Sequence, residues 1–498
     1  MTMEGPMRRA FLAMLVLAAV ACRTGTDSAA PDEDEEETRP PTPPEWDRVV
    51  TRPAEAEASA RRQACTFGRG ALAGETLGKE VPIEKDIPLE TIVVLMQENR
   101  SFDHYFSHFG RYAGRTDVAS AKDGTTNPVD RTPTIAVRPY QHAPHLCFLD
   151  TDHGWRGSHE QYNDGKMDGF VVTNHKYKGE VLPDPNKETT DGGRAMWWYD
   201  ERDIPFYYAL AKSFGIGDHY HASLMGPTWV NRMFLYGGTS FGLTHNTLPS
   251  IKGKEFPGYD LTLFDELEKR HVSWGFYASG PPGVALMLGA TMGTRWGRRV
   301  TKSVAEFHAD AAAGRLPQVA FVDTNYLDVG DPEDGETEHP PEDLQRGQKF
   351  VYDLVRSLTR SPQWKSLALF ITYDEHGGLY DHVVPPPACV PDVSPVTGEP
   401  GQVVSGAFDR LGFRVPLLVV SPFAKRGYVS HETYDHTSIL RFIQAKHRVP
   451  ALTARDANAR IPTDFFDFSR PPDLAVPAFT EPPIDPVEAE YCRLTFKR

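Results

Sequence analysis

The sequence has little cysteine, fewer basic than acidic residues, and no apolar run long enough to cross a bilayer. Its 498 residues include five cysteines, and no two of the last four have zinc-ligand spacing, which argues against a structural zinc site. Lys and Arg number 53 against 68 Asp and Glu, for a net charge of −15. Nucleic-acid binding needs clustered positive charge, so we expect no nucleic-acid partner. No internal repeat is present.

The N-terminus reads as an export signal over residues 1–22. Arg8 and Arg9 precede the apolar run Ala10–Ala21, which has the length of a signal-peptide core and is too short for a membrane span. The pair fits a twin-arginine signal or an ordinary Sec signal. The segment ending in Cys22 is similar to a bacterial lipobox, with Ala19 where Leu is usual. We therefore expect export from a bacterial cell with Cys22 acylated; the alternative is nearby cleavage and secretion.

Residues 23–60 are predicted to be a disordered tether ahead of one domain over residues 61–498. The tether contains the acidic run Asp32–Glu37 followed by four prolines, and it has almost no apolar residues to bury. The four remaining cysteines allow up to two disulfides in an exported chain, with three possible pairings. One candidate, Cys65–Cys492, would join the two ends of the domain.

The pattern of the remaining chain predicts an α/β fold. Apolar runs of strand length recur at Thr91–Met96, Ser273–Ala278, Val319–Asp323, Leu367–Tyr373 and Val415–Val420. Helical spacing occurs at Leu261–Arg270, Gln345–Leu358 and Asp435–Ala445. This alternation predicts a mostly parallel sheet with helices on both faces. We expect the stretch Gly110–Asp203 to form long irregular loops over the active-site edge.

Polar residues follow two of these strands directly. Glu98 and Asn99 come after the first, and Asp374 and Glu375 come after a later one. Ligands of open α/β sheets bind at the carboxyl ends of strands. Carboxylate and amide oxygens suit Mg, Ca or Mn and tolerate Zn. A single acidic pair is more often a helix cap, but two such ends, one followed by Gly377-Gly378, favour one divalent metal ion.

A hydroxyl and two imidazoles complete the candidate chemistry. Thr228 lies in a Gly-Pro turn that presents its hydroxyl, which needs a base or a metal to become a nucleophile. Without other evidence, a threonine in such a turn is more often a turn or helix N-cap residue than a nucleophile. His153 and His339 lie in loops, and imidazole has the pKa to protonate a leaving group. A lone histidine is more often an ordinary surface or core residue.

Together these motifs resemble a known family. Glu98–Phe106, His153-Gly154-Trp155, Gly165–Phe170, Gly226–Arg232, Glu338–Pro341 and Tyr373–Val383 match, in order, the bacterial and fungal phosphoesterase family. That family contains non-specific phospholipases C and acid phosphatases, and the match runs from about Glu90 to Phe442. The resemblance implies an alkaline-phosphatase-like three-layer sandwich.

The resemblance also implies residue roles. Thr228 is the nucleophile that forms a phosphothreonine, and His153 and His339 contact phosphoryl oxygens or protonate the alcohol. The metal is bound by Glu98, Asn99, Thr228, Asp374 and Glu375, while His376, Asp381, His382 and Asn231 orient the ligands. Val230 replaces the proline usual in this motif, which affects the turn more than the chemistry.

The resemblance leaves three functions open. The first is a phospholipase C that acts on phosphatidylcholine-like diesters, which needs an apolar approach to the metal. The second, the alternative to this leading function, is a broad-specificity acid phosphatase, which is plausible because the chain ends soon after the matched region, where larger phospholipases carry further β-domains. The third, a non-catalytic binding lipoprotein, is disfavoured by the complete set of site residues. Aromatic residues suited to a substrate mouth, or equally to burial, are Trp155, Phe170, Trp197, Trp198 and Tyr199.

Overall fold

The computed structural model describes residues 41–129, 137–174, 192–246, 262–280, 283, 299, 302–325, 331, 335–392 and 407–496. The expected signal segment 1–22, with Cys22, lies outside these residues, as do residues 23–40 of the expected tether. Within the described part, none of the helices combines the length and the apolarity that a membrane crossing requires.

An eight-stranded sheet organises the chain in the order β13-β6-β12-β11-β1-β10-β8-β9. Its strands are β1 (Thr91–Gln97), β6 (Gly215–Gly217), β8 (Trp274–Ala278), β9 (Lys302–Ser303), β10 (Val319–Asp323), β11 (Leu367–Tyr373), β12 (Leu417–Val420) and β13 (Tyr428–Ser430). The central strand β1 pairs in parallel with β10 and β11. Every residue of β1 and β11 is buried, as expected for runs of apolar residues covered on both faces.

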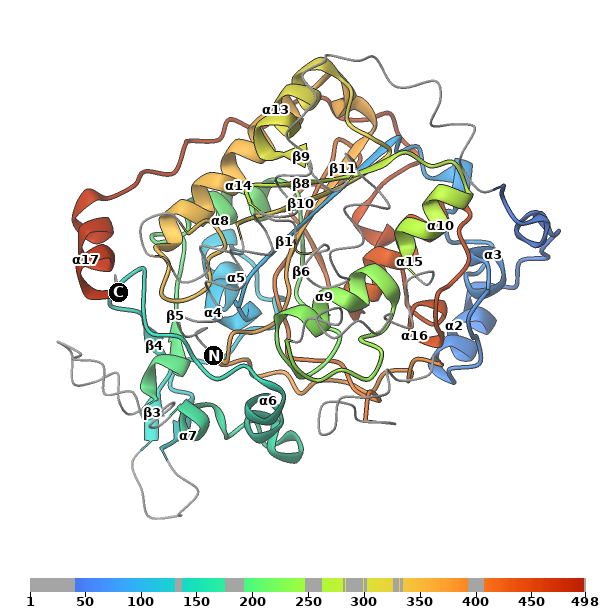
Figure 1. The fold of residues 1–498 in the computed structure, drawn as a ribbon. Helices are drawn as coiled ribbons and strands as arrows, with labels where there is room; N and C mark the ends of the chain where they lie inside the picture. Colours follow the sequence, from blue (N-terminus) through green and yellow to red (C-terminus); the bar gives the residue numbers. More distant parts are fainter. Residues whose placement is uncertain are drawn as a thin grey trace, which may run out of the picture.

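Helices cover both faces of this sheet, as Figure 1 shows. On one side lie α8 (Pro205–Ser213), α13 (Val304–Ala313) and α14 (Leu344–Thr359); on the other lie α9 (Thr228–Gly237), α10 (Leu263–Lys269) and α15 (His436–His447). The other α-helices of the described residues are α2 (Glu55–Gln63), α3 (Ala73–Thr76), α4 (Phe102–Phe106), α5 (Phe109–Ala113), α6 (Trp155–Tyr162), α7 (Phe170–Asn174), α16 (Ala454–Ala457) and α17 (Pro486–Phe496). The predicted α/β class with a three-layer arrangement is confirmed.

The predicted strands and helices occur close to their expected positions, and the sheet is mostly parallel, as predicted. Strand β12 runs antiparallel to both β11 and β6. A short apolar run carries no signal of strand direction, because direction depends on how the connecting chain crosses the sheet. The N-cap residue of α15 is Asp435.

Two expectations about irregular regions are wrong in part. Residues 41–60, assigned to the tether, include the short 3-10 helix Pro44–Asp47 and most of α2, and the Trp46 side chain is buried. The single tryptophan supplies the apolar surface that the composition of the segment as a whole lacks. The stretch Gly110–Asp203, expected to be irregular, contains α6, α7 and the short strands β2 (Thr126–Pro128), β3 (Val137–Pro139), β4 (Gln141–His142) and β5 (Trp197–Trp198) in its described parts.

Two disulfides join segments far apart in the chain. Cys65 pairs with Cys389, and Cys147 pairs with Cys492. The expected number of disulfides is confirmed, while the candidate pairing Cys65–Cys492 is wrong. The Cys147–Cys492 bond ties α17 to the loop that follows β4.

Candidate active site

The neighbouring strands β1 and β11 end at the same level and place four polar residues together. Gln97 is in register with Tyr373, so Glu98 and Asp374 are the next residues of each strand. The backbone N–H of Asn99 donates to Asp374 Oδ1 at 3.1 Å. Asn99 has a φ of 60°, which turns the chain away from the sheet at this point. The structure thus brings Glu98, Asn99, Asp374 and Glu375 to one edge, as the sequence predicts.

Each of these four side chains holds an oxygen without a hydrogen-bond partner among the described residues. The atoms are Glu98 Oε1, Asn99 Oδ1, Asp374 Oδ2 and Glu375 Oε1, and each of these residues is at most 1% exposed. An unsatisfied buried polar group costs about 1–3 kcal/mol. A set of buried hard oxygens that accept no hydrogen bond is what a divalent cation requires, so the donor set fits such an ion. The oxygens of Glu98, Asp374 and Glu375 are spread more widely than the ligand atoms of four other groups of His, Cys, Asp and Glu residues in the described structure. In each of those groups the ligand atoms lie within 4.8 Å of one another.

Burial and mutual repulsion act on the acids of this set. The pKa of Glu98 is raised well above its ordinary value by burial and by the charge of Asp374, although Arg232 opposes the shift. The pKa of Glu375 is raised for the same two main reasons, burial and Asp374. Carboxyl groups with such raised pKa values are typical of a site that a cation completes.

The Gly377-Gly378 pair allows the backbone after β11 to lie close to the backbone after β1, a tight turn that the sequence suggests. Gly377 has a φ of 66°, and a Cβ on it would lie 2.3 Å from the carbonyl oxygen of Asn99. Its N–H donates to Glu375 Oε2 at 2.7 Å. A larger residue here would push the two strand ends apart.

Thr228 is the first residue of α9, and its side chain is nearly buried. The turn before it is held by Asn231, whose Nδ2 donates to Gly226 O at 2.8 Å and whose Oδ1 accepts from Leu224 N at 3.0 Å. One helical turn beyond Thr228, Arg232 reaches the acidic residues. Its guanidinium lies 3.5 Å from Glu98 Oε1 and 3.6 Å from Asp374 Oδ2. Thr228 and Arg232 lie on the same face of α9. The candidate nucleophile is therefore on the helix face that is turned toward the acidic residues.

The two predicted histidines lie beside the same acids. His153 Nδ1 donates to Thr151 O at 2.7 Å, which leaves Nε2 facing Asn99 Nδ2 at 3.3 Å and Glu375 Oε1 at 4.0 Å. His339 Nδ1 donates to Pro340 O at 2.6 Å, and its ring lies 5.5 Å from that of His153. Burial lowers the pKa of His339. Both rings therefore present a lone pair on Nε2, and Asp150 joins them in a compact group.

The sequence profile of the Phosphoesterase family matches residues 89–450, which is most of the chain. The chain belongs to the Phosphoesterase family. It is 32% identical to Non-specific phospholipase C1 of Arabidopsis thaliana over 74% of this chain and 69% of that protein. It is also 32% identical to Phospholipase C B of Mycobacterium tuberculosis over 79% of this chain and 80% of that protein.

A solved structure of a protein in the alkaline phosphatase superfamily from Vibrio parahaemolyticus overlaps 87% of this chain and 77% of that one. Its TM-score is 0.37 and its identity is 10%. Membership of the Phosphoesterase family makes the protein a phosphoric ester hydrolase.

Sequence reasoning missed two charged residues at this phosphoesterase site. Arg232 is the last residue of the Gly226–Arg232 motif, but the sequence assigned it no role. Its guanidinium also lies 3.3 Å from Asp323 Oδ1. Asp323 is the last residue of β10, next to β1 in the sheet. The signal that singled out Glu98 and Asp374, an acid at the end of a buried strand, applies equally to Asp323.

Glu338, just before His339, is held in place by three tyrosines. Tyr105 and Tyr373 each donate to Glu338 Oε2 at 2.6 Å, and Tyr207 donates to Oε1. The Arg100 guanidinium donates to the carbonyl oxygen of Glu338, whose φ is 70°. This buried clamp fixes the start of the loop that carries His339, and no local pattern in the sequence indicated it.

The remaining predicted residues fall into two groups. His376 contacts the site directly, because its Nδ1 lies 3.3 Å from Glu375 Oε2 while Nε2 bonds Gln161 Oε1 at 2.6 Å. Asp381 and His382 belong to a separate buried network with Asp103 and Arg414. Of the aromatic candidates, Phe170, Trp197 and Tyr199 are buried, whereas Trp155 and Trp198 are only half-buried.

Proposed function

We propose that this protein is an exported, metal-dependent phosphoesterase of the phospholipase C type that works through a phosphothreonine on Thr228. The observation that carries the proposal is the set of four buried oxygens without a hydrogen-bond partner among the described residues, on Glu98, Asn99, Asp374 and Glu375. Thr228 begins the helix face whose Arg232 contacts two of these residues. Phospholipase C activity is named for relatives that align with most of the chain.

The chain's own groups supply the steps. The Thr228 oxygen attacks phosphorus, the new P–O bond replaces the bond to the leaving alcohol, and the hydroxyl proton passes to that alcohol. The lone pair on Nε2 of His153 or His339 is suited to carry this proton. Water then attacks the phosphothreonine and restores the hydroxyl. A divalent ion held by the four oxygens and Thr228 would favour the threonine alkoxide and neutralise charge on the phosphoryl group.

The N-terminal part of the proposal concerns location. We propose that residues 1–22 direct export and that acylation of Cys22 anchors the protein to a membrane. A lipid anchor would keep the enzyme close to phospholipid substrates. The alternative substrate class is soluble phosphomonoesters, as for a broad-specificity acid phosphatase.

Hydrolysis of two soluble substrates tests the activity. Residues 41–498, which include the segment packed through Trp46, are assayed with p-nitrophenyl phosphorylcholine and p-nitrophenyl phosphate, with and without chelator. We expect chelator-sensitive cleavage mainly of the choline diester. Thr228→Ala should abolish cleavage while the protein stays folded, and Thr359→Ala on α14 is the matched control.

Three results would change the proposal. Normal turnover by folded Thr228→Ala would reject the nucleophile. Preference for the monoester would favour the acid phosphatase. Absence of cleavage of either substrate, with metal bound, would favour a binding lipoprotein.

A further inference from the structure

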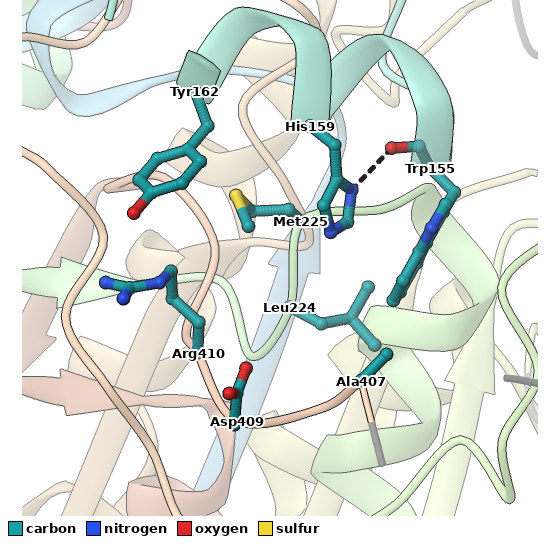
Figure 2. A pocket seen from close by; sticks show the side chains of 8 residues that line it. All are labelled: Trp155, His159, Tyr162, Leu224, Met225, Ala407, Asp409 and Arg410. Carbon is teal, nitrogen blue, oxygen red and sulfur yellow. Dashed lines mark hydrogen bonds between the residues drawn. The ribbon is translucent and has the colours of Figure 1, made fainter. Parts of the chain in front are cut away.

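A cavity of about 280 Å³ lies beside the turn that presents Thr228. It is lined by Trp155, His159, Tyr162, Leu224, Met225, Ala407, Asp409 and Arg410 (Figure 2). In Figure 2 the α6 side chains form one wall, Met225 lies near the centre, and the Asp409 carboxylate points into the space from the opposite side.

Short covalent connections link this cavity to the proposed reaction centre. Met225 precedes Thr228 by three residues, so their Cα atoms lie within about 11 Å. Trp155 follows His153 by two residues. A Cβ on Gly226 would lie 3.4 Å from the Trp155 ring, so that ring packs against the turn before Thr228. Asn231, which holds this turn, also binds the backbone of Leu224.

The charged groups around the cavity leave one carboxylate available. Asp409 is exposed, and its side chain makes no hydrogen bond or ion pair with the described residues. The neighbouring Arg410 donates to Pro385 O at 2.6 Å and covers the Tyr162 ring at 5.2 Å. The buried Arg455 nearby donates to the backbone carbonyl of Ser223 at 2.8 Å. Neither cation forms an ion pair with Asp409 among the described residues, although the charge of Asp409 acts on Arg455 and opposes the lowering of its pKa by burial.

His159, Trp155 and Met225 are suited to receive a positive group, whereas the guanidinium of Arg410 in the same lining opposes one. His159 Nδ1 donates to Trp155 O at 2.7 Å, so its Nε2 carries a lone pair. Trp155 presents an aromatic ring and Met225 a polarizable thioether. Aromatic faces together with a carboxylate are the features that bind organic cations in water.

We propose that this cavity binds the ammonium-bearing alcohol of a phosphodiester substrate, with Asp409 and Trp155 as its specificity residues. The inference rests on the proposed function, because the alcohol reaches the cavity only while its phosphorus lies at Thr228. The alcohol stays esterified to phosphorus when the other alcohol leaves, so the cavity holds it in both the substrate and the phosphothreonine. Asp409 thus selects cationic over neutral diesters without taking part in the bond changes.

The kinetic test compares p-nitrophenyl phosphorylcholine with its uncharged isostere, in which a tert-butyl group replaces trimethylammonium. We expect the natural enzyme to prefer the choline diester by about fivefold in kcat/KM, since one ion–carboxylate or cation–π contact contributes about 1 kcal/mol. Asp409→Asn should remove this preference through KM and leave p-nitrophenyl phosphate turnover unchanged. Asp86→Asn, an exposed carboxylate just before β1, is the control.

A binding measurement separates this inference from the proposed function. Phosphocholine is titrated calorimetrically into Thr228→Ala and into Thr228→Ala/Asp409→Asn, which requires no turnover. A Kd about fivefold weaker in the double variant supports the cavity assignment. Equal Kd values, or equal kcat/KM for the two diesters in the natural enzyme, would overturn it while leaving phosphoester hydrolysis intact. Loss of all hydrolysis with the Kd difference retained would instead reject only the catalytic proposal.

Discussion

Arg232 Nε lies 3.6 Å from Asp374 Oδ2, and both side chains are fully buried. The same guanidinium contacts Glu98 and Asp323, so one cation offsets part of the repulsion among three acids. The positive charge of Arg232 therefore stabilises the close arrangement of these acids at the sheet edge.

We expect Arg232→Met to destabilise the protein by about 3–5 kcal/mol, because removing one partner leaves buried carboxylates uncompensated. The measurement is urea unfolding in the presence of chelator. Adding divalent metal should recover more stability in the variant than in the natural protein. An Arg232→Met protein as stable as its parent without metal would contradict this account of the charge balance.

Metal binding should be measurable apart from catalysis. We expect a divalent ion at about 100 times its Kd to stabilise the fold by about 2.7 kcal/mol, since it binds only the native arrangement of Glu98, Asn99, Asp374 and Glu375. Thermal unfolding with added Ca, Mg, Mn or Zn checks this. Asp374→Asn should lose the metal-dependent rise in Tm, whereas Glu490→Gln on α17 should keep it. An equal rise in all three proteins would place the ion elsewhere.

The Glu338 clamp predicts an ordered set of stabilities. Tyr207→Phe removes one of three hydroxyl donors from a buried carboxylate and should cost about 2 kcal/mol in the free energy of unfolding. Tyr208→Phe removes a bond to the backbone oxygen of Tyr105 and should cost about 1 kcal/mol. Urea unfolding of both variants makes the comparison. Phosphoesterase activity should fall further in Tyr207→Phe, because the loop carrying His339 starts at Glu338.

The His382–Asp103 pair predicts a pH dependence of stability. Burial opposes charge on His382, but the hydrogen bond and charge of Asp103 outweigh it and raise the pKa of His382. Burial likewise opposes charge on Asp103, yet Arg414 and His382 lower the pKa of that carboxyl. The contribution of the pair is therefore present above about pH 4 and is lost as pH rises through the raised pKa of His382, above about 6.5.

Thermal unfolding of His382→Ala checks this dependence. The Tm difference from the natural protein should be larger near pH 5.5 than near pH 9. His308→Ala is the control, since burial lowers the pKa of His308 and its effect should not shrink with rising pH. A His382→Ala difference that is constant across this range would show that the imidazole charge contributes nothing to folding.

Several parts of the site were predictable because they depend on local sequence. The runs Thr91–Met96 and Leu367–Tyr373 are apolar throughout, and such runs become buried parallel strands whose carboxyl ends carry the ligands. The acids that follow each run therefore had to lie at the sheet edge. Thr228 was predictable from its turn and from the family motif, and α9 does begin at that residue.

Other parts were hidden because they depend on contacts between distant segments. Glu338 meets Tyr105 and Tyr207 across 233 and 131 residues of sequence. The disulfide partners are separated by 324 and 345 residues, and the positions of four cysteines in a sequence do not determine which of them pair. The direction of β12 likewise depends on the path of the chain between strands.

By itself, the sequence determined the α/β class, the two acidic strand ends and the chemical character of the donors, because strand burial and side-chain chemistry are local properties. Only the tertiary structure decided that Arg232 stands among the acids, that three tyrosines hold Glu338, and that Trp155 and Asp409 face one cavity. These arrangements arise when the sheet and its helices pack, since packing brings together side chains that no sequence spacing relates.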